Sequence, residues 1–247
     1  MKLVRFSYKG EIFGGRIEED EIVVKAGESG FRKININEVK LLAPVEPSKI
    51  VSVGLNYKDH AEELGMAIPS EPILFLKPST AVIGPGDNII YPGVTNRMDY
   101  EAELAVVIKD RIHNISKDRA FSHIAGYTCF NDVTSRDLQK KDIQWSRAKS
   151  FDTFAPMGPW IETNLDPSDL RIRSYVNGNL KQNSRTSEFI FNIPELIEFI
   201  SGVMTLLPGD IITTGTPKGI GALNPGDEVT IEIEGIGRLT NQVKSFA

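Results

Sequence analysis

Apolar and polar positions along the chain predict a fold in which strands outnumber helices. Short apolar stretches, such as residues 3–6 and 21–24, recur through about the first 45 residues and are separated by glycines. Residues 228–234 alternate strictly between polar and apolar, which is typical of a strand with one face in solvent. Helical patterns are fewer, at residues 57–64, 135–143 and 193–204. The pattern therefore predicts an α+β fold in which sheet is dominant.

Turns that contain proline and glycine mark the strands and divide the chain. Three Pro-Gly-Asp turns precede β-branched stretches, at residues 85–87, 208–210 and 225–227. Proline sets φ for a turn and glycine accepts positive φ, so each turn predicts a strand directly after it. Residues 43–48 carry two prolines among polar residues, which suits a linker. We therefore expect a small β-rich module with its linker at residues 1–47, and a main domain at residues 48–247.

The composition favours a cytoplasmic protein that acts on small molecules. No apolar run approaches the roughly 20 residues of a membrane helix, and Arg5 interrupts the apolar N-terminus, so we expect neither a membrane span nor a signal peptide. The single cysteine, Cys129, excludes an intramolecular disulfide and a cysteine-cluster zinc site. A net charge of -5, with dispersed lysines and arginines, disfavours nucleic acid as a partner.

Two glutamates lead into a strand that must be buried. Glu101 and Glu103 precede the apolar residues 104–108, and side chains two apart on a strand share a face. A second strand, residues 124–130, runs into Asp132, which it could deliver as a third carboxylate if the strands pair. Three carboxylates without thiolate or imidazole specify a hard ion, Mg²⁺ or Mn²⁺. The alternative is that the glutamates form the solvated face of an edge strand.

His60 and Glu63 form a candidate general-base pair. They lie three residues apart in a predicted helix, so they share a face on which the carboxylate can orient the imidazole. Such a pair can move a proton to or from a substrate. The alternative is a surface histidine on an acidic helix.

Two lysines and a glycine-rich loop are further candidates for substrate contacts. Lys77 and Lys149 each interrupt an apolar or tightly turned segment, and a buried lysine requires a carboxylate partner from the protein or from a substrate. Lys77 could equally be a strand-end residue whose ammonium reaches water. Residues 213–221 are rich in glycine and hydroxyl groups and can present backbone amides to an anion. Neither the P-loop order nor a G-x-G-x-x-G or G-x-S-x-G motif is present, so a nucleotide cofactor and a serine nucleophile lack support.

Taken together, six segments resemble the fumarylacetoacetate hydrolase family, in the family's order and over about residues 48–247. No single segment is decisive, but the ordered set is specific. The segments are Val53-Gly-Leu-Asn-Tyr57 with His60, Phe75-Leu-Lys-Pro-Ser79, Asp99-Tyr-Glu-Ala-Glu-Leu-Ala105, Gly126-Tyr127 with Asn131-Asp-Val-Thr-Ser-Arg-Asp-Leu-Gln139, Ala148-Lys-Ser-Phe-Asp152, and Gly215-Thr-Pro-Lys-Gly-Ile-Gly221.

The resemblance implies a mixed β-roll core, usually seen in a homodimer. It implies that Mg²⁺ or Mn²⁺, with Ca²⁺ as a possible substitute, is held by Glu101, Glu103 and Asp132. His60 and Glu63 match a catalytic pair on a segment that orders as a lid in the smaller members. Substrate contacts are implied at Arg136, Gln139, Lys149 and Thr216. We place Lys77 with the substrate-binding residues because its ammonium needs a carboxylate, and Lys149 with the catalytic ones because it adds positive charge beside the metal.

The branch that the chain resembles contains small acylpyruvases, oxaloacetate decarboxylases and hydroxymuconate isomerases. These activities share one demand, which is that negative charge on an enolate be stabilised. We predict cleavage of a carbon-carbon bond of a small 2-oxo acid through a metal-bound enolate, by acylpyruvate hydrolysis or oxaloacetate decarboxylation. One alternative is isomerisation of a 2-hydroxyhepta-2,4-diene-1,7-dioate or 5-carboxymethyl-2-hydroxymuconate dienol. The other is a non-enzymatic binding module stabilised by Ca²⁺.

Overall fold

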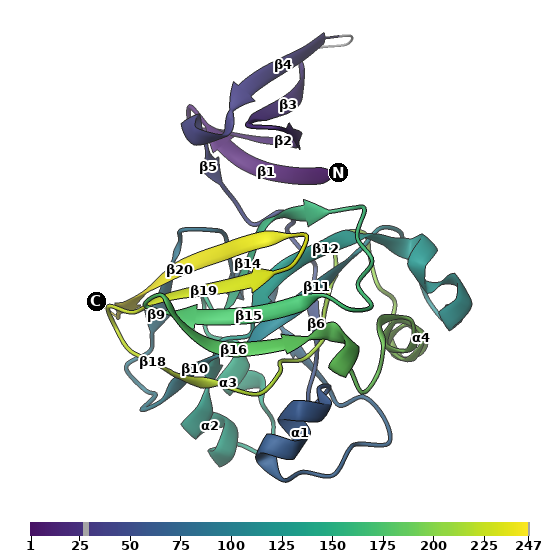
Figure 1. Ribbon diagram of the computed structural model, residues 1–247, viewed down its shortest axis with the longest axis vertical. Helices are drawn as coiled ribbons and strands as arrows, with labels where there is room; N and C mark the ends of the chain where they lie inside the picture. Colours follow the sequence, from purple (N-terminus) through teal and green to yellow (C-terminus); the bar gives the residue numbers. More distant parts are fainter. Residues whose placement is uncertain (27–29, 247) are drawn as a thin grey trace.

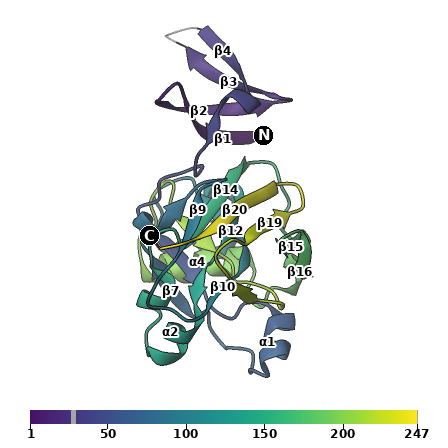
Figure 2. The same cartoon turned by 90° about the vertical axis from the view of Figure 1, so that its left-hand side faces the viewer.

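A computed structural model describes residues 1–26 and 30–246 of the chain. Its first 41 residues form the β-rich module that the sequence predicts, an antiparallel meander that ends in a short strand paired with the first. These elements are β1 (Lys2–Tyr8), β2 (Glu11–Glu18), β3 (Glu21–Ala26), β4 (Gly30–Asn35), η1 (Ile36–Glu38) and β5 (Lys40–Leu41). Figures 1 and 2 show this module projecting from one end of a larger body.

The central sheet of the body continues from the module, because β1 pairs with β14 in antiparallel register. From β1 the order of the strands is β14, β12, β11, β17, β6 and β7, while β8 pairs with β14 off this path. Their bounds are Ala155–Glu162 for β14, Ile124–Asn131 for β12, Ala102–Ile108 for β11, Ile211–Thr213 for β17, Ile50–Val53 for β6, Leu74–Lys77 for β7 and Val82–Ile83 for β8. All seven residues of β11 are buried, as a strand in the middle of a sheet requires.

A second sheet packs over the central one and encloses the main apolar core (Figure 1). Its order is β16 (Asn179–Arg185), β15 (Arg171–Val176), β19 (Glu228–Ile233), β20 (Gly237–Ser245) and β9 (Asn88–Tyr91). A small third sheet joins β13 (Thr134–Ser135), β10 (Met98–Tyr100) and β18 (Gly221–Leu223). The sheet-dominant α+β class that the sequence predicts is confirmed. The Pro-Gly-Asp turns are also confirmed, since Gly86, Gly209 and Gly226 have positive φ and strands follow each turn.

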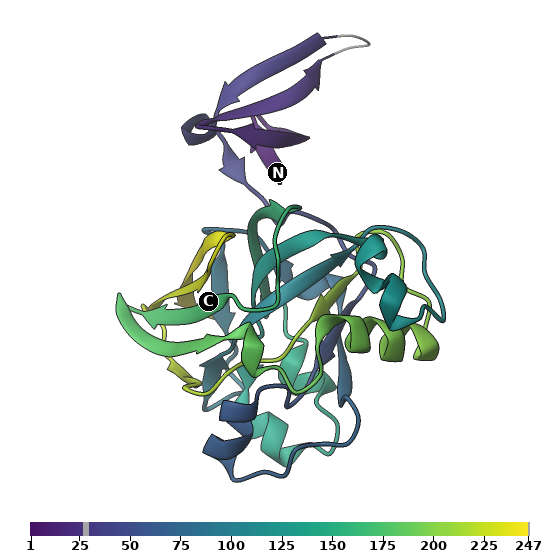
Figure 3. The same cartoon turned by 45° about the vertical axis from the view of Figure 1, so that its right-hand side comes forward.

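The helices are short and cover two places on the body. Figures 1 and 3 show α1, α2 and α3 gathered at the end away from the N-terminal module, whereas α4 packs beside the 3-10 segment η3. The helices are α1 (Lys58–Leu64), α2 (Arg136–Lys141), α3 (Ser146–Lys149) and α4 (Ile193–Val203). The 3-10 segments are η2 (Ser79–Ala81), η3 (Lys117–His123) and η4 (Thr186–Glu188). A capping box at Asn192 and Glu195 starts α4 where Pro194 predicts a helix start. No helix in the described ranges is long and apolar enough to cross a membrane.

Candidate active site

Strand pairing brings together the three carboxylates that the sequence singles out. Asp132 follows β12, whose partner β11 begins beside Glu101, and the amide of Asp132 donates to the Glu101 carbonyl at 2.9 Å. Ligand oxygens of Glu101, Glu103 and Asp132 all lie within 4.8 Å of one another, and all three residues are buried. The edge-strand alternative is wrong, because β11 lies between β12 and β17. Glu101 itself lies between β10 and β11, where the chain passes from the small sheet to the central one.

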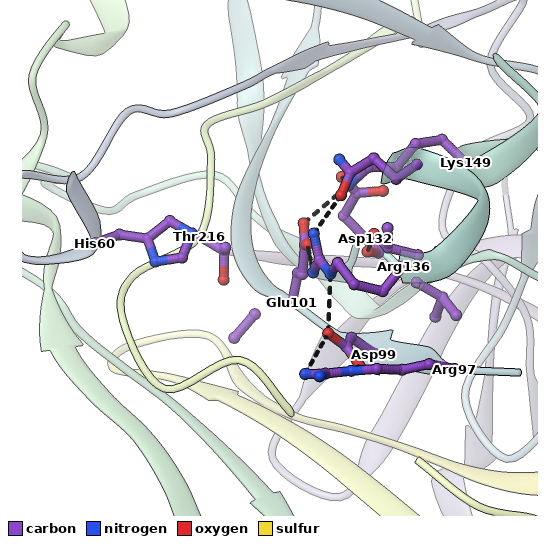
Figure 4. A network of polar contacts seen from close by, with 12 residues as sticks. His60, Arg97, Asp99, Glu101, Asp132, Arg136, Lys149 and Thr216 are labelled. Atoms are coloured by element: carbon purple, nitrogen blue, oxygen red, sulfur yellow. Dashed lines mark hydrogen bonds and ion pairs between the residues drawn. The ribbon is translucent and has the colours of Figure 1, made fainter. Parts of the chain in front are cut away.

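Three cations surround this carboxylate cluster. The Lys149 Nζ donates to Glu101 at 2.9 Å and to Asp132 at 2.6 Å, and Arg136 donates to Glu101 (Figure 4). Lys77 Nζ donates to the other oxygen of Asp132 at 2.5 Å. Because the Lys77 side chain is fully buried, the alternative that it reaches water is wrong. It lies outside the lining of the neighbouring cavity, so its contact in the structure is to Asp132 rather than to a substrate position.

The three cations form ion pairs with Glu101 and Asp132 but not with Glu103 in the described residues. Burial alone would raise the pKa of Glu101, but Lys149 and Arg136 outweigh burial and lower it to about 2. Burial, followed by the charges of Asp132 and Glu101, raises the pKa of Glu103 well above its ordinary value. Glu103 accepts a hydrogen bond from the Gly215 amide at 2.9 Å and forms no ion pair within the described part of the chain.

A divalent cation fits this donor set. An ion beside Glu103 would supply the counter-charge that this carboxylate lacks, and three convergent carboxylate oxygens are the ligands that hard ions prefer. Glu101, Glu103 and Asp132 are therefore the residues that would hold it. The identity of the ion does not follow from the ligands, because Mg²⁺ and Mn²⁺ take the same oxygen donors.

The candidate base stands across the cavity from the carboxylate cluster. His60 and Glu63 lie on α1, and Nδ1 of the imidazole is 2.9 Å from the Glu63 carboxylate. The Gly219 amide donates to the same carboxylate at 3.0 Å and so connects α1 to the glycine-rich loop. His60 is buried, so the alternative of a surface histidine is wrong. Figure 4 shows His60 beside Thr216, with Thr216 between it and Glu101 in this view.

The cavity between these groups has a volume of about 330 Å³. It brings together most of the predicted site residues with apolar side chains from α1 and β7. Polar and charged residues in its lining are His60, Glu101, Glu103, Asp132, Arg136, Gln139, Lys140, Lys149 and Thr216. The larger apolar ones are Leu55, Leu64, Met66, Ile73, Phe75 and Trp145. A cavity of about 480 Å³ beside the start of α4 has only Lys117 and Glu195 as charged lining residues, so it lacks comparable chemistry.

Sequence reasoning assigned no role to two residues that organise this site. Asp99 is fully buried and accepts hydrogen bonds from Arg97 and from Arg136, so it orients the guanidinium that contacts Glu101 (Figure 4). Asp99 lies two residues before Glu101, and this spacing, like that of the two glutamates, is typical of side chains on one face of a strand. Gln182 lies on β16, and its side chain forms hydrogen bonds with Ala102 and Thr216. No motif or periodic pattern around Gln182 in the sequence predicts this role.

Both parts of the chain match known protein families. Residues 49–244 match the family described as fumarylacetoacetate (FAA) hydrolase C-terminal, and residues 1–44 match the one described as Rv2993c-like, N-terminal. The mitochondrial oxaloacetate tautomerase FAHD2B of Bos taurus is 46% identical over 220 residues, which is 84% of this chain and 70% of that protein.

Two solved structures extend the likeness to the whole chain. A 5-carboxymethyl-2-hydroxymuconate delta-isomerase from Mycobacterium smegmatis has 46% identity and a TM-score of 0.94, with 100% of both chains covered. A maleylpyruvate hydrolase from Sphingobium, in complex with manganese (II) ion and pyruvate, has 30% identity and a TM-score of 0.86, also with 100% of both chains covered. Similar proteins thus include a tautomerase, an isomerase and a hydrolase. The chain belongs to the fumarylacetoacetate hydrolase family.

Proposed function

We propose that this protein is a divalent-metal-dependent enzyme that moves a proton between the keto and enol forms of a small 2-oxo dicarboxylic acid. The observation that carries the proposal is the placement of one imidazole, held by a carboxylate, across a single cavity from a metal-type carboxylate cluster. Proton transfer next to a carbonyl needs a base and a means to stabilise the enolate, and this cavity contains candidates for both. The similar tautomerase and isomerase support the same reaction class.

The charge of the site favours a substrate with two carboxylates. In total charge, the three carboxylates are matched by Lys77, Lys149 and Arg136, although none of these cations pairs with Glu103 in the described residues. The buried Asp99 is matched by Arg97. A divalent ion would therefore add two positive charges to a site that is otherwise neutral. Such a site attracts a dianion more strongly than a monoanion, because its charges lie in a concave cavity beside buried groups rather than on an open surface.

The residues of the chain divide the chemistry between them. A bound divalent ion supplies Lewis-acid stabilisation of negative charge on the 2-oxo oxygen. Lys149 and Arg136 add fixed positive charge beside the cluster. Glu63 contacts Nδ1 of His60, which leaves Nε2 as the nitrogen that takes the proton from the substrate carbon and delivers it to the oxygen of the resulting enolate, which completes the enol. Apolar residues of the lining, including Leu64 and Met66, form the less polar side of the cavity.

Cleavage of a carbon-carbon bond, the reaction favoured by the sequence, is the second candidate. The observation in its favour is the similar maleylpyruvate hydrolase in complex with manganese (II) ion and pyruvate. In that case His60 would activate a water molecule for attack on a remote carbonyl.

The homodimer and the physiological ion stay predictions. Light scattering and metal analysis of the purified protein would test them.

One set of assays separates these functions. Oxaloacetate, an acylpyruvate and a hydroxymuconate-type dienol are each incubated with the protein in chelator and then with added Mg²⁺ or Mn²⁺, and both enol absorbance and pyruvate release are recorded. We expect metal-dependent enol loss without pyruvate release above the enzyme-free rate. Replacement of His60 by alanine should slow it about 10²–10⁴-fold, while His113→Ala, at an exposed histidine, should not.

Three results would contradict the proposal. Pyruvate release at the rate of enol loss would favour cleavage instead. Turnover that is insensitive to chelator would remove the metal. The absence of turnover with every substrate, combined with a Ca²⁺-dependent gain in thermal stability, would favour the non-enzymatic binding module.

A further inference from the structure

Gln182 connects the strand that carries the carboxylates to the loop that carries Thr216. Its side chain is fully buried. The side-chain oxygen accepts from the amide of Ala102, which lies between Glu101 and Glu103, at 3.0 Å. The side-chain nitrogen donates to the Thr216 hydroxyl and to the Pro217 carbonyl, both at 2.8 Å.

These partners leave only one orientation for the Gln182 amide. The backbone amide of Ala102 can only donate and the carbonyl of Pro217 can only accept, so the oxygen of Gln182 must face the former and its nitrogen the latter. The nitrogen therefore donates to the oxygen of Thr216, and the Thr216 hydroxyl proton must point elsewhere. Within residues 1–26 and 30–246 no acceptor for that proton is found, and Thr216 lines the cavity.

The backbone beside Gln182 packs closely against the loop that carries Thr216. A β-bulge in β16 places Lys181 as the extra residue immediately before Gln182, and bulges commonly redirect a neighbouring side chain. Gly219, in the same loop as Thr216, lies so close to this bulge that an added Cβ would be 2.6 Å from the Lys181 carbonyl oxygen. The loop and the bulge are therefore closely packed at this point.

We propose that Gln182 is a positioning residue that commits the Thr216 hydroxyl to donate a hydrogen bond into the cavity, and so selects a substrate with a carboxylate or enolate oxygen at that point. The inference rests on the proposed function for the charge of the substrate, but not on which reaction follows binding. Because Gln182 engages one lone pair of the Thr216 oxygen and no acceptor for the Thr216 proton is found among the described residues, the hydroxyl favours an acceptor oxygen of the ligand over an amide N–H. Gln182 acts through Thr216 and does not touch the substrate.

A double-mutant cycle tests this role. Dissociation constants for oxalate, a small dianion, are measured in the presence of Mg²⁺ by titration calorimetry, together with KM and kcat for oxaloacetate. Thr216→Val should weaken oxalate binding and raise KM about tenfold or more, while Thr216→Ser should restore both. Gln182→Glu, which keeps an acceptor toward Ala102 but removes the donor toward Thr216, should produce a similar loss. The control Asn183→Leu, at the next and exposed residue of β16, should leave both constants unchanged.

Coupling between the two sites decides the outcome. If Gln182 works through the hydroxyl, Gln182→Glu or Gln182→Leu introduced into Thr216→Val should cause little further loss of binding. Additive losses, or equal affinity of Gln182→Leu and wild type, would overturn the inference. Thermal midpoints of all variants would identify a loss that is due to unfolding.

If wild type binds oxalate with Mg²⁺ but does not turn over any substrate, only the proposed reaction fails. If wild type does not bind oxalate, the anion site itself fails, and this inference with it.

Discussion

Replacement of Glu103 by glutamine should stabilise the metal-free protein while removing its response to metal. Glu103 is the member of the carboxylate cluster without an ion pair in the described residues, so its charge is buried beside two like charges. Glutamine has nearly the same shape and can keep the hydrogen bond from the Gly215 amide through its side-chain oxygen. The substitution therefore removes a charge with little change in packing.

The geometry of the cluster sets the size of the effect. Two unit charges 4.8 Å apart repel by about 3–4 kcal/mol at an effective dielectric constant of about 20. Lys149 offsets part of this repulsion, so we expect a net gain of about 1 kcal/mol in the free energy of unfolding, or about 2–4 °C in Tm. A divalent ion at one hundred times its Kd adds about 2.7 kcal/mol to the wild type, or about 5–10 °C.

The assay is thermal unfolding of both proteins in chelator and in excess Mn²⁺. Glu103→Gln should unfold at a higher temperature than wild type in chelator and at a lower one in Mn²⁺. The matched control is Asp210→Asn, at a buried carboxylate that is bonded to Ser48, Lys49 and Leu207; it should lower Tm in both conditions and keep the wild-type Mn²⁺ shift. If Glu103→Gln is less stable than wild type in chelator, or gains as much from Mn²⁺, the electrostatic reasoning is refuted.

Three further predictions concern the base, the loop and acid stability. Glu63→Gln should reduce turnover about tenfold or more and leave the Mn²⁺ shift in Tm intact, because Glu63 orients His60 and is not a metal ligand; loss of the shift would contradict this separation. Gly219→Ala should cost about 1–3 kcal/mol in thermal or urea unfolding, because φ is +94° and the new Cβ would meet the Lys181 carbonyl; a neutral variant would show that the loop can move. Burial would raise the pKa of Asp210, but hydrogen bonds from Lys49 and Ser48 lower it in the folded protein. The ionised Asp210 therefore stabilises the fold above its unfolded pKa of about 3.9, and this stabilisation is lost as the pH falls through the lower folded pKa. Asp210→Asn should therefore flatten the loss of stability below about pH 4, and an unchanged acid limb in a pH series of unfolding curves would argue against it.

The sequence by itself determined the local elements and the types of ligand. The period of two residues in strands and of 3.6 residues in helices indicates which side chains share a face, and turn residues indicate where strands begin. Both patterns are local, because they depend only on residues that are close in the chain. Thus the strands after the Pro-Gly-Asp turns and the shared face of His60 and Glu63 were predictable. The same spacing indicated that Glu101 and Glu103 could converge, and the family resemblance made a metal site the expected reading.

Only the tertiary structure decided which charges balance each other. Lys77 and Asp132 are 55 residues apart, and their contact depends on how the strands are ordered in the central sheet, which no local pattern encodes. The same holds for Gln182, which lies on a different sheet from Ala102 and reaches it through the packing of the two layers. The energy of a buried charge depends on all its neighbours and on its exclusion from water. That Glu103 has no ion pair among the described residues therefore becomes visible only when the fold is assembled.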